Sequence, residues 1–247
     1  MAHRTFIRDT VGKRALLCIH GFLGSPEHFE RFMPAVPEDV AVYNILLEGH
    51  GGSVRDFSKA SMVKWKKQTE DMLLKMMEKY SEIYIAGHSM GTLFAIELAV
   101  KYPETVKKLF LLQSPLKIGV RVDATKNTMK ALFGHYSPDD IEAEEYSRAH
   151  SVKLNKRLWQ YIGWIPRYME LFALSREGRE TIKKLNTPCI IFQSKKDELV
   201  SIKSVHFVPH KGNIRLEILK GSKHFMYSRE DFEIMNREFK KLFIDEC

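Results

Sequence analysis

Ser89, Asp197 and His224 are residues whose types and chain order could carry out nucleophilic chemistry. A serine hydroxyl is a weak nucleophile at neutral pH unless a neighbouring base takes its proton, and that base needs a carboxylate to orient it. A histidine and an aspartate supply these two groups. Together the three side chains could attack a carbonyl carbon and form a covalent acyl intermediate, provided that the fold brings these distant positions together.

Ser89 stands at the centre of the sequence Gly-His-Ser-Met-Gly. A short apolar run typical of a strand ends at Gly87, and a helix-prone run over 92–101 follows Gly91. A strand, a tight turn and a helix with serine at the apex form a nucleophile elbow, in which glycines relieve crowding on both sides. The alternative is a chance glycine-serine turn, but the flanking strand and helix are the context that the motif requires.

The acid and the base are expected directly after strands, because functional groups gather at the carboxyl ends of parallel strands. The strand-like run 189–193 leads to Asp197, and the run 214–219 leads to His224. The order serine, aspartate, histidine along the chain is the order of this architecture.

Other residues could take these roles. Glu198 adjoins the predicted acid, and Asp123 follows the preceding strand. His206 and His210 precede the last predicted strand and are alternative bases. Structural roles are expected for the histidines beside the serine or in glycine-rich loops, namely His20, His50 and His88.

Strand and helix patterns alternate along most of the chain. Strands are expected at 3–9, 15–19, 40–46, 83–87, 106–113, 189–193 and 214–219, and helices near 27–33 and over 61–80, 92–101 and 231–244. This alternation predicts the α/β class, with a mostly parallel sheet covered by helices on both faces. The methionine-rich stripe of the 61–80 helix is expected to fill the core.

Residues 119–176 have a different character, with no convincing strand, many aromatic residues and several breaks at glycine and proline. We expect three or four short helices that form a cap inserted after the strand at 106–113. Residues 1–118 and 177–247 would then form the core domain. An apolar stripe at helical spacing in the cap either packs on the core or lines an acyl pocket. The candidates for such a pocket are Trp159, Trp164, Met169 and Phe172.

Four motifs follow one another along the chain: HGFLGS at 20–25, EGHGGS at 48–53, GHSMG at 87–91 and the two loops that carry the predicted acid and base. Together they resemble the α/β-hydrolase family of serine esterases and lipases, most of all the small bacterial carboxylesterases and monoacylglycerol lipases. The resemblance implies that the backbone N–H groups of Phe22 and Met90 form an oxyanion hole. It also implies a small ester substrate, of short or medium acyl length or a monoacylglycerol, with no metal or organic cofactor.

The same three residues leave other functions open. A thioesterase or an acyltransferase would differ only in the leaving group or the acceptor. A relative of this fold that binds a ligand without turning it over is a further alternative, although all three catalytic positions are filled. Haloalkane dehalogenation is disfavoured, since those relatives carry aspartate at the elbow.

Composition narrows the class of protein further. The chain has 247 residues with 44% hydrophobic content, enough for one α/β domain. Its 39 basic and 31 acidic residues give a net charge of +8, but no dense basic run with interleaved aromatic residues predicts nucleic-acid binding. Three cysteines without metal-type spacing favour a reducing, cytoplasmic setting. Neither a secretory leader nor an apolar run of membrane-spanning length is recognised, so no stable membrane insertion is expected.

Overall fold

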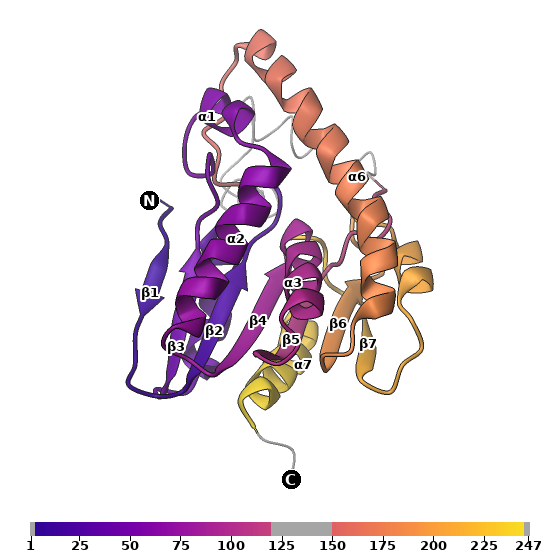
Figure 1. Cartoon of the computed structure of the whole chain (residues 1–247). Helices are drawn as coiled ribbons and strands as arrows, with labels where there is room; N and C mark the ends of the chain where they lie inside the picture. Colours follow the sequence, from indigo (N-terminus) through magenta and orange to yellow (C-terminus); the bar gives the residue numbers. More distant parts are fainter. Residues whose placement is uncertain (1–2, 120–149, 245–247) are drawn as a thin grey trace.

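The computed structural model describes residues 3–119 and 150–244, which form a central sheet with helices on both sides (Figure 1). The strands are β1 (Phe6–Arg8), β2 (Arg14–Ile19), β3 (Val40–Ile45), β4 (Glu82–His88), β5 (Val106–Leu112), β6 (Cys189–Ser194) and β7 (Ile214–Leu219). The α-helices are α1 (Val54–Lys59), α2 (Met62–Met77), α3 (Met90–Lys101), α6 (Ile165–Thr181) and α7 (Arg229–Lys240). The 3-10 helices are η1 (Pro26–Ala35), η2 (Leu158–Trp164), η3 (Ile182–Lys184), η4 (Ile202–Phe207) and η5 (Lys241–Phe243).

The seven strands lie in the order β1-β3-β2-β4-β5-β6-β7. β1 pairs antiparallel with β3 at one edge, and every other neighbouring pair is parallel. β2 pairs with β3 at one of its edges and with β4 at the other. The chain therefore leaves β2 in one direction along the sheet and leaves β4 in the opposite direction. The crevice between the loops that follow these two strands is the topological switch point, where open α/β sheets bind their ligands.

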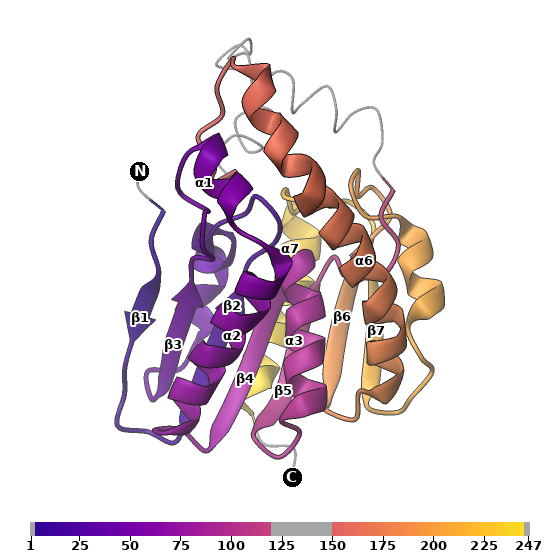
Figure 2. The ribbon, with the colours of Figure 1, turned by 45° about the horizontal axis from the view of Figure 1, so that its top comes forward.

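Both faces of the sheet are covered (Figures 1 and 2). Helices α2, α3 and α6 pack on one face around buried residues such as Trp65 and Leu93. Helices η1 and α7 pack on the other face around Phe32 and Phe239. The mostly parallel, doubly covered sheet predicted from the sequence is therefore confirmed. The predicted core role of the α2 stripe is confirmed too, because its apolar face is buried: Met62, Trp65, Leu73 and Met76.

Side-chain caps set where several helices begin. Ser53 and Asp56 form a capping box at the start of α1, in which each side chain accepts a hydrogen bond from the other residue's backbone N–H. Ser61 caps α2 and Ser228 caps α7 in the same position. Each such cap stabilises its helix by about 1 kcal/mol, because it satisfies a backbone donor that the helix itself cannot.

The region predicted as a cap can be compared with the structure from residue 150 onward. A break in its helical stripe was expected near Pro166, and η2 ends at Trp164 where α6 begins at Ile165. Pro166 lies in the first turn of α6, where a missing N–H costs nothing. With 17 residues, α6 is longer than the short helices expected in this region. Residue 176, the predicted end of the cap, lies inside this helix, which continues to Thr181. The predicted cap residues 120–149, with Asp123 among them, lie outside the described residues.

Candidate active site

Ser89 lies between β4 and α3 in a strained backbone conformation, with φ 50° and ψ −123°. The flanking glycines are required by close contacts. A Cβ on Gly91 would lie 2.1 Å from the carbonyl oxygen of Ile19, and one on Gly87 would lie 2.8 Å from the Cα of Thr92. Both contacts are with backbone atoms, so larger residues would force the turn open. This is the geometry of a nucleophile elbow, and it leaves the Ser89 side chain at the carboxyl edge of the sheet.

The imidazole of His224 contacts the carboxylate of Asp197, at 2.8 Å from Nδ1 to Oδ2. Asp197 is held in turn by two backbone donors, because its Oδ1 accepts from the N–H groups of Leu199 at 2.8 Å and Val200 at 2.7 Å. Both side chains of the pair are buried. With Nδ1–H donating to Asp197, the other ring nitrogen, Nε2, is the one that can accept a proton.

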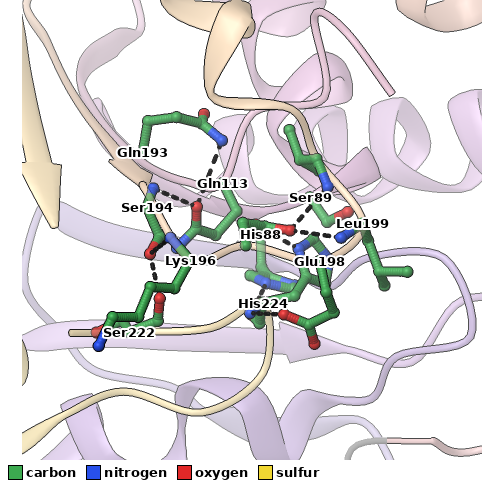
Figure 3. Close-up of polar contacts among 12 residues, drawn as sticks. His88, Ser89, Gln113, Gln193, Ser194, Lys196, Glu198, Leu199, Ser222 and His224 are labelled. Carbon is green, nitrogen blue, oxygen red and sulfur yellow. Dashed lines mark hydrogen bonds and ion pairs between the residues drawn. The ribbon is translucent and has the colours of Figure 1, made fainter. Parts of the chain in front are cut away.

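The backbone of His224 is held on both sides. Its N–H donates to Glu198 Oε2 at 3.1 Å, and its carbonyl oxygen accepts from His88 Nε2 at 3.1 Å. Glu198 therefore contacts the main chain of the histidine, while Asp197 contacts the ring. His88 lies beside Ser89 in the sequence, so its contact brings the histidine loop to the elbow (Figure 3).

Electrostatics distinguish His224 from the other histidines nearby. Burial disfavours its charged form, but the charge and hydrogen bond of Asp197, helped by the charge of Glu198, outweigh burial and raise the pKa of His224 above 6.5. Burial lowers the pKa of His20 to about 4 and that of His28 to about 3. His224 is thus the histidine of this group that is poised to exchange a proton near neutral pH.

A network of polar contacts joins the loops that follow β5, β6 and β7 (Figure 3). Gln113 Oε1 accepts the backbone N–H of Ser194 at 2.9 Å, and Ser194 Oγ donates to the carbonyl oxygen of Ser222. Asp231, in the first turn of α7, accepts from the N–H groups of Gly221 and Ser222, each at 2.8 Å. These contacts fix the loops that carry the predicted acid and base. This role of Asp231 was not recognised from the sequence, where its only signal was an acidic residue in the first turn of a helix.

The HGFLGS loop lies directly against the elbow. A Cβ on Gly21 would be 2.8 Å from the Cβ of Ser89, so only glycine allows this approach. His20 fixes this loop through both ring nitrogens. Its Nδ1–H donates to the carbonyl oxygen of Gly21 at 2.9 Å, and its Nε2 accepts the N–H of Leu47 at 3.0 Å. His20 thus has the structural role expected from the sequence. Phe22, the next residue along the chain, was predicted to be an oxyanion donor.

Aromatic packing explains the position of Phe22. Its ring lies 5.0 Å from Phe57, 6.0 Å from Trp65 and 5.0 Å from Tyr168 on α6. The first two are core residues, so the HGFLGS loop is anchored on the same face as α2. Tyr168 connects that loop with α6 and was not singled out from the sequence. Met90, the other predicted oxyanion residue, begins α3, where the first-turn N–H groups lack partners within the helix.

The four predicted pocket residues lie in different environments. Trp164 is only 5% exposed, and its indole Nε1–H donates to the carbonyl oxygen of Val54 at 2.9 Å, so it packs η2 against α1. Trp159 and Met169 are 65% and 67% exposed, and Phe172 is 47% exposed. His206 and His210, the alternative bases, are exposed on and after η4. No cluster of potential metal ligands occurs among residues 3–119 and 150–244.

A protein-family model described as serine aminopeptidase, S33, matches residues 12–230. The chain belongs to this family. The mouse serine hydrolase-like protein is 29% identical over 99 residues, which cover 40% of this chain and 32% of that protein. Lipase 1 of Psychrobacter immobilis is 30% identical over 107 residues, which cover 42% of this chain and 32% of that protein. The chain thus aligns with only about a third of the length of either relative.

Solved structures show the same fold across nearly the whole chain. A structure from a study of the metagenome-derived lipolytic enzymes LipS and LipT has a TM-score of 0.70 at 16% identity, covering 98% of this chain and 97% of that one. The monoacylglycerol lipase of Paleococcus ferrophilus has a TM-score of 0.69 at 13% identity, covering 98% of each. This member of the S33 family therefore has the α/β-hydrolase fold. Its described helices include none that is long and apolar enough to cross a bilayer.

Proposed function

We propose that this protein is a carboxylic ester hydrolase that forms an acyl-enzyme on Ser89. The observation that carries the proposal is the buried contact between Asp197 and the Nδ1 of His224, in a loop that His88 ties to the elbow. Such a pair supplies the oriented base that a serine nucleophile needs. Support also comes from the names of its relatives, which include lipases, a putative esterase/lipase and a monoacylglycerol lipase.

In the proposed mechanism His224 Nε2 takes the hydroxyl proton as Ser89 Oγ attacks the ester carbonyl carbon. The oxyanion that forms accepts hydrogen bonds from the backbone N–H groups of Phe22 and Met90. Loss of one such donor typically costs about 3 kcal/mol of transition-state stabilisation. His224 then gives its proton to the leaving alcohol, and Asp197 stabilises the charged ring throughout.

Water completes the reaction. His224 Nε2 accepts a proton from a water molecule as that water attacks the acyl-enzyme carbonyl, and the proton passes to Ser89 Oγ as the acid leaves. All groups in this scheme belong to the chain, so it requires no metal or organic cofactor. If an alcohol replaced water at this step, the same residues would catalyse acyl transfer, and a thioester substrate would make the protein a thioesterase.

We place the acyl group along α6, near Tyr168 and Phe172. Tyr168 contacts the ring of Phe22, and Phe172 lies one helical turn further along the same helix. The helix is anchored beyond them by Ser175 Oγ, which donates to the carbonyl oxygen of Pro115 at 2.5 Å. In this proposal α6 and residues 119–176 act as a cap over a core of 1–118 and 177–247. A cytoplasmic setting, supported by the free buried thiols Cys18 and Cys189, is part of the proposal.

A fluorophosphonate probe tests the proposal, because it labels activated serines. The wild-type protein is expected to be labelled and to hydrolyse p-nitrophenyl esters, whereas Ser89→Ala is expected to do neither. Ser114→Ala is the matched control, since Ser114 is a buried serine whose Oγ has no hydrogen-bond partner. Equal turnover by Ser89→Ala and wild type would refute the proposal. An aminoacyl-p-nitroanilide, a thioester and an added alcohol acceptor separate peptidase, thioesterase and transferase activities.

A further inference from the structure

We propose that the tip of the molecule beside the active site is a docking surface for an anionic phospholipid bilayer. The tip surface consists of apolar residues on η2 and α6 and basic residues around them: Leu158, Trp159, Ile162, Ile165, Met169, Arg55, Lys59, Lys153, Lys156 and Arg157. Its use in bringing the site to a lipid ester rests on the proposed function, but bilayer binding itself does not depend on catalysis.

The apolar half of the tip surface is exposed to an unusual degree. Its five large side chains are between 57% and 67% exposed, whereas large apolar residues of the core are almost fully buried. They lie on η2 and the first two turns of α6, so they gather at one end of the molecule rather than at scattered positions. A contiguous exposed apolar face next to a site marks an interaction surface.

The tip is firmly attached to the body of the protein. Trp164 Nε1–H donates to the carbonyl oxygen of Val54, and a Cβ on Gly163 would lie 2.8 Å from the Cβ of Ser58. η2 therefore packs closely on α1. The N–H of Lys153 also donates to the carbonyl oxygen of Gly52 at 2.9 Å. These contacts hold α1 and η2 side by side at the end of the molecule (Figures 1 and 2).

The charges around this face are positive. Residues 150–169 include no acidic residue, and Lys153, Lys156 and Arg157 are exposed without an ion pair in the described part of the chain. On α1, Asp56 is the acidic residue, and its carboxylate is occupied by the capping box, while Arg55 and Lys59 add further positive charge.

An apolar face rimmed by cations fits an anionic bilayer better than a second copy of the chain. Two copies joined through this face would bring like charges together, which is unfavourable. A bilayer offers anionic headgroups to the lysine and arginine side chains and acyl chains to the tryptophan, leucine and isoleucine side chains.

The apolar residues of the tip surface lie close to the candidate active site. Ile165 and Met169 flank Tyr168 on α6, and Tyr168 contacts Phe22 beside the elbow. A bilayer bound at the tip would therefore lie next to the carboxyl edge of the sheet, where Ser89 is. A long-chain ester could then reach the site without crossing water.

Tryptophan fluorescence reads out docking directly. The chain has three tryptophans, of which Trp65 and Trp164 are buried and Trp159 is 65% exposed. Vesicles of phosphatidylcholine containing about one third phosphatidylglycerol should shift the emission to shorter wavelength and protect it from acrylamide. Pure phosphatidylcholine vesicles should do so much less, and high salt should reverse the effect. Trp159→Phe should abolish the change in emission.

Two double variants test the two halves of the surface by vesicle sedimentation. Leu158→Ser/Ile162→Ser and Lys156→Gln/Arg157→Gln should each weaken binding on the order of tenfold. The matched controls lie at the opposite end of the molecule: Val11→Ser, and Lys75→Gln/Lys107→Gln. Both should bind as the wild type does. All variants should hydrolyse a water-soluble p-nitrophenyl ester at the wild-type rate.

Three outcomes would overturn the proposal. The first is that anionic vesicles change neither emission nor sedimentation. The second is that Trp159 is already shielded from acrylamide without vesicles, as it would be if the chain's own acidic stretch at 139–145 covered it. The third is a wild-type dimer that the tip variants convert to monomer. Vesicle binding by Ser89→Ala, or by a wild type without esterase activity, would leave docking intact and count only against the proposed function.

Discussion

The carboxylate of Glu198 accepts the backbone N–H of His224, while the adjacent Asp197 contacts the ring of the same histidine. Two adjacent carboxylates thus contact the same histidine, one at its backbone and the other at its ring. The side chains differ in length by one methylene group, and the loop after β6 turns so that the shorter one reaches the imidazole. Sequence position alone left the choice of catalytic acid open between them, and the geometry favours Asp197.

Exchanging each acid for its amide should separate these roles. Asp197→Asn should lower kcat by about 10³ to 10⁴-fold. Its oxygen would remain with the two N–H groups of Leu199 and Val200, so its NH₂ would face Nδ1 of His224 and favour the wrong tautomer. Glu198→Gln keeps an oxygen for the backbone N–H, so its kcat should change only a few-fold. Steady-state kinetics on a p-nitrophenyl ester measure both effects. A larger loss of kcat in Glu198→Gln than in Asp197→Asn would show that Glu198, and not Asp197, is the catalytic acid.

Activity should fall as the pH is lowered through the pKa of His224. The base must be neutral to accept the serine proton, and Asp197 raises this pKa above 6.5. The acid limb of kcat/KM should therefore lie above pH 6.5. Glu198→Gln removes a nearby negative charge, so it should move the limb to lower pH. A limb unchanged in this variant would contradict the electrostatic role of Glu198.

Protein stability should respond to pH over a lower range. Burial lowers the pKa of His20 to about 4, whereas in the unfolded chain this histidine takes up its proton near 6.5. The unfolded state then binds more protons, so stability falls as the pH drops from 6.5 towards 4. Measuring Tm across this range identifies any loss of activity that comes from unfolding. If Tm stayed constant between these values, His20 would not be the buried neutral residue seen here.

The elbow should not tolerate a methyl group at its second glycine. In Gly91→Ala the new Cβ would approach the carbonyl oxygens of Ile19 and His20 to 2.1 and 2.7 Å, and neither backbone group is free to move. Overpacking of this kind costs about 1–3 kcal/mol, so we expect Tm to fall by several degrees together with esterase activity. Gly212→Ala is the control, because no atom lies within 4 Å of its Cβ position. Similar Tm values for the two variants would refute the steric argument.

Much of the fold could be predicted because its signals are local. The buried strands are continuous apolar runs, and the Gly-x-Ser-x-Gly motif places a strand before Ser89 and a helix after it. Chain order pointed to Asp197 and His224. The contacts of Asp231 and His88 could not be predicted, since they join residues that meet only after the sheet has formed. The break near Pro166 could be predicted too, because a proline is excluded from a helix interior but is favoured in a first turn, and α6 begins at Ile165.

The acyl-length preference should depend on Tyr168 and Phe172. If the acyl chain lies along α6, each methylene buried from water adds up to about 0.8 kcal/mol, or roughly fourfold in kcat/KM, until the space is filled. Specificity should therefore rise with acyl length and then level off at a definite length. Phe172→Ala should move that length upward, because it removes a large side chain beyond the contact between Tyr168 and Phe22. Tyr168→Ala should do the same and also raise KM for short esters, since the ring that contacts Phe22 in the HGFLGS loop is lost.

The controls are two other aromatic residues of the same region. Trp164→Phe loses the hydrogen bond to Val54, so it should lower Tm without moving the preferred length. Tyr161→Phe loses the hydroxyl that accepts the N–H of Asn155, and it should behave in the same way. A series of p-nitrophenyl esters of increasing acyl length, assayed for all four variants and the wild type, gives the comparison. If the preferred length is identical in all five proteins, the acyl chain lies elsewhere and α6 does not set specificity.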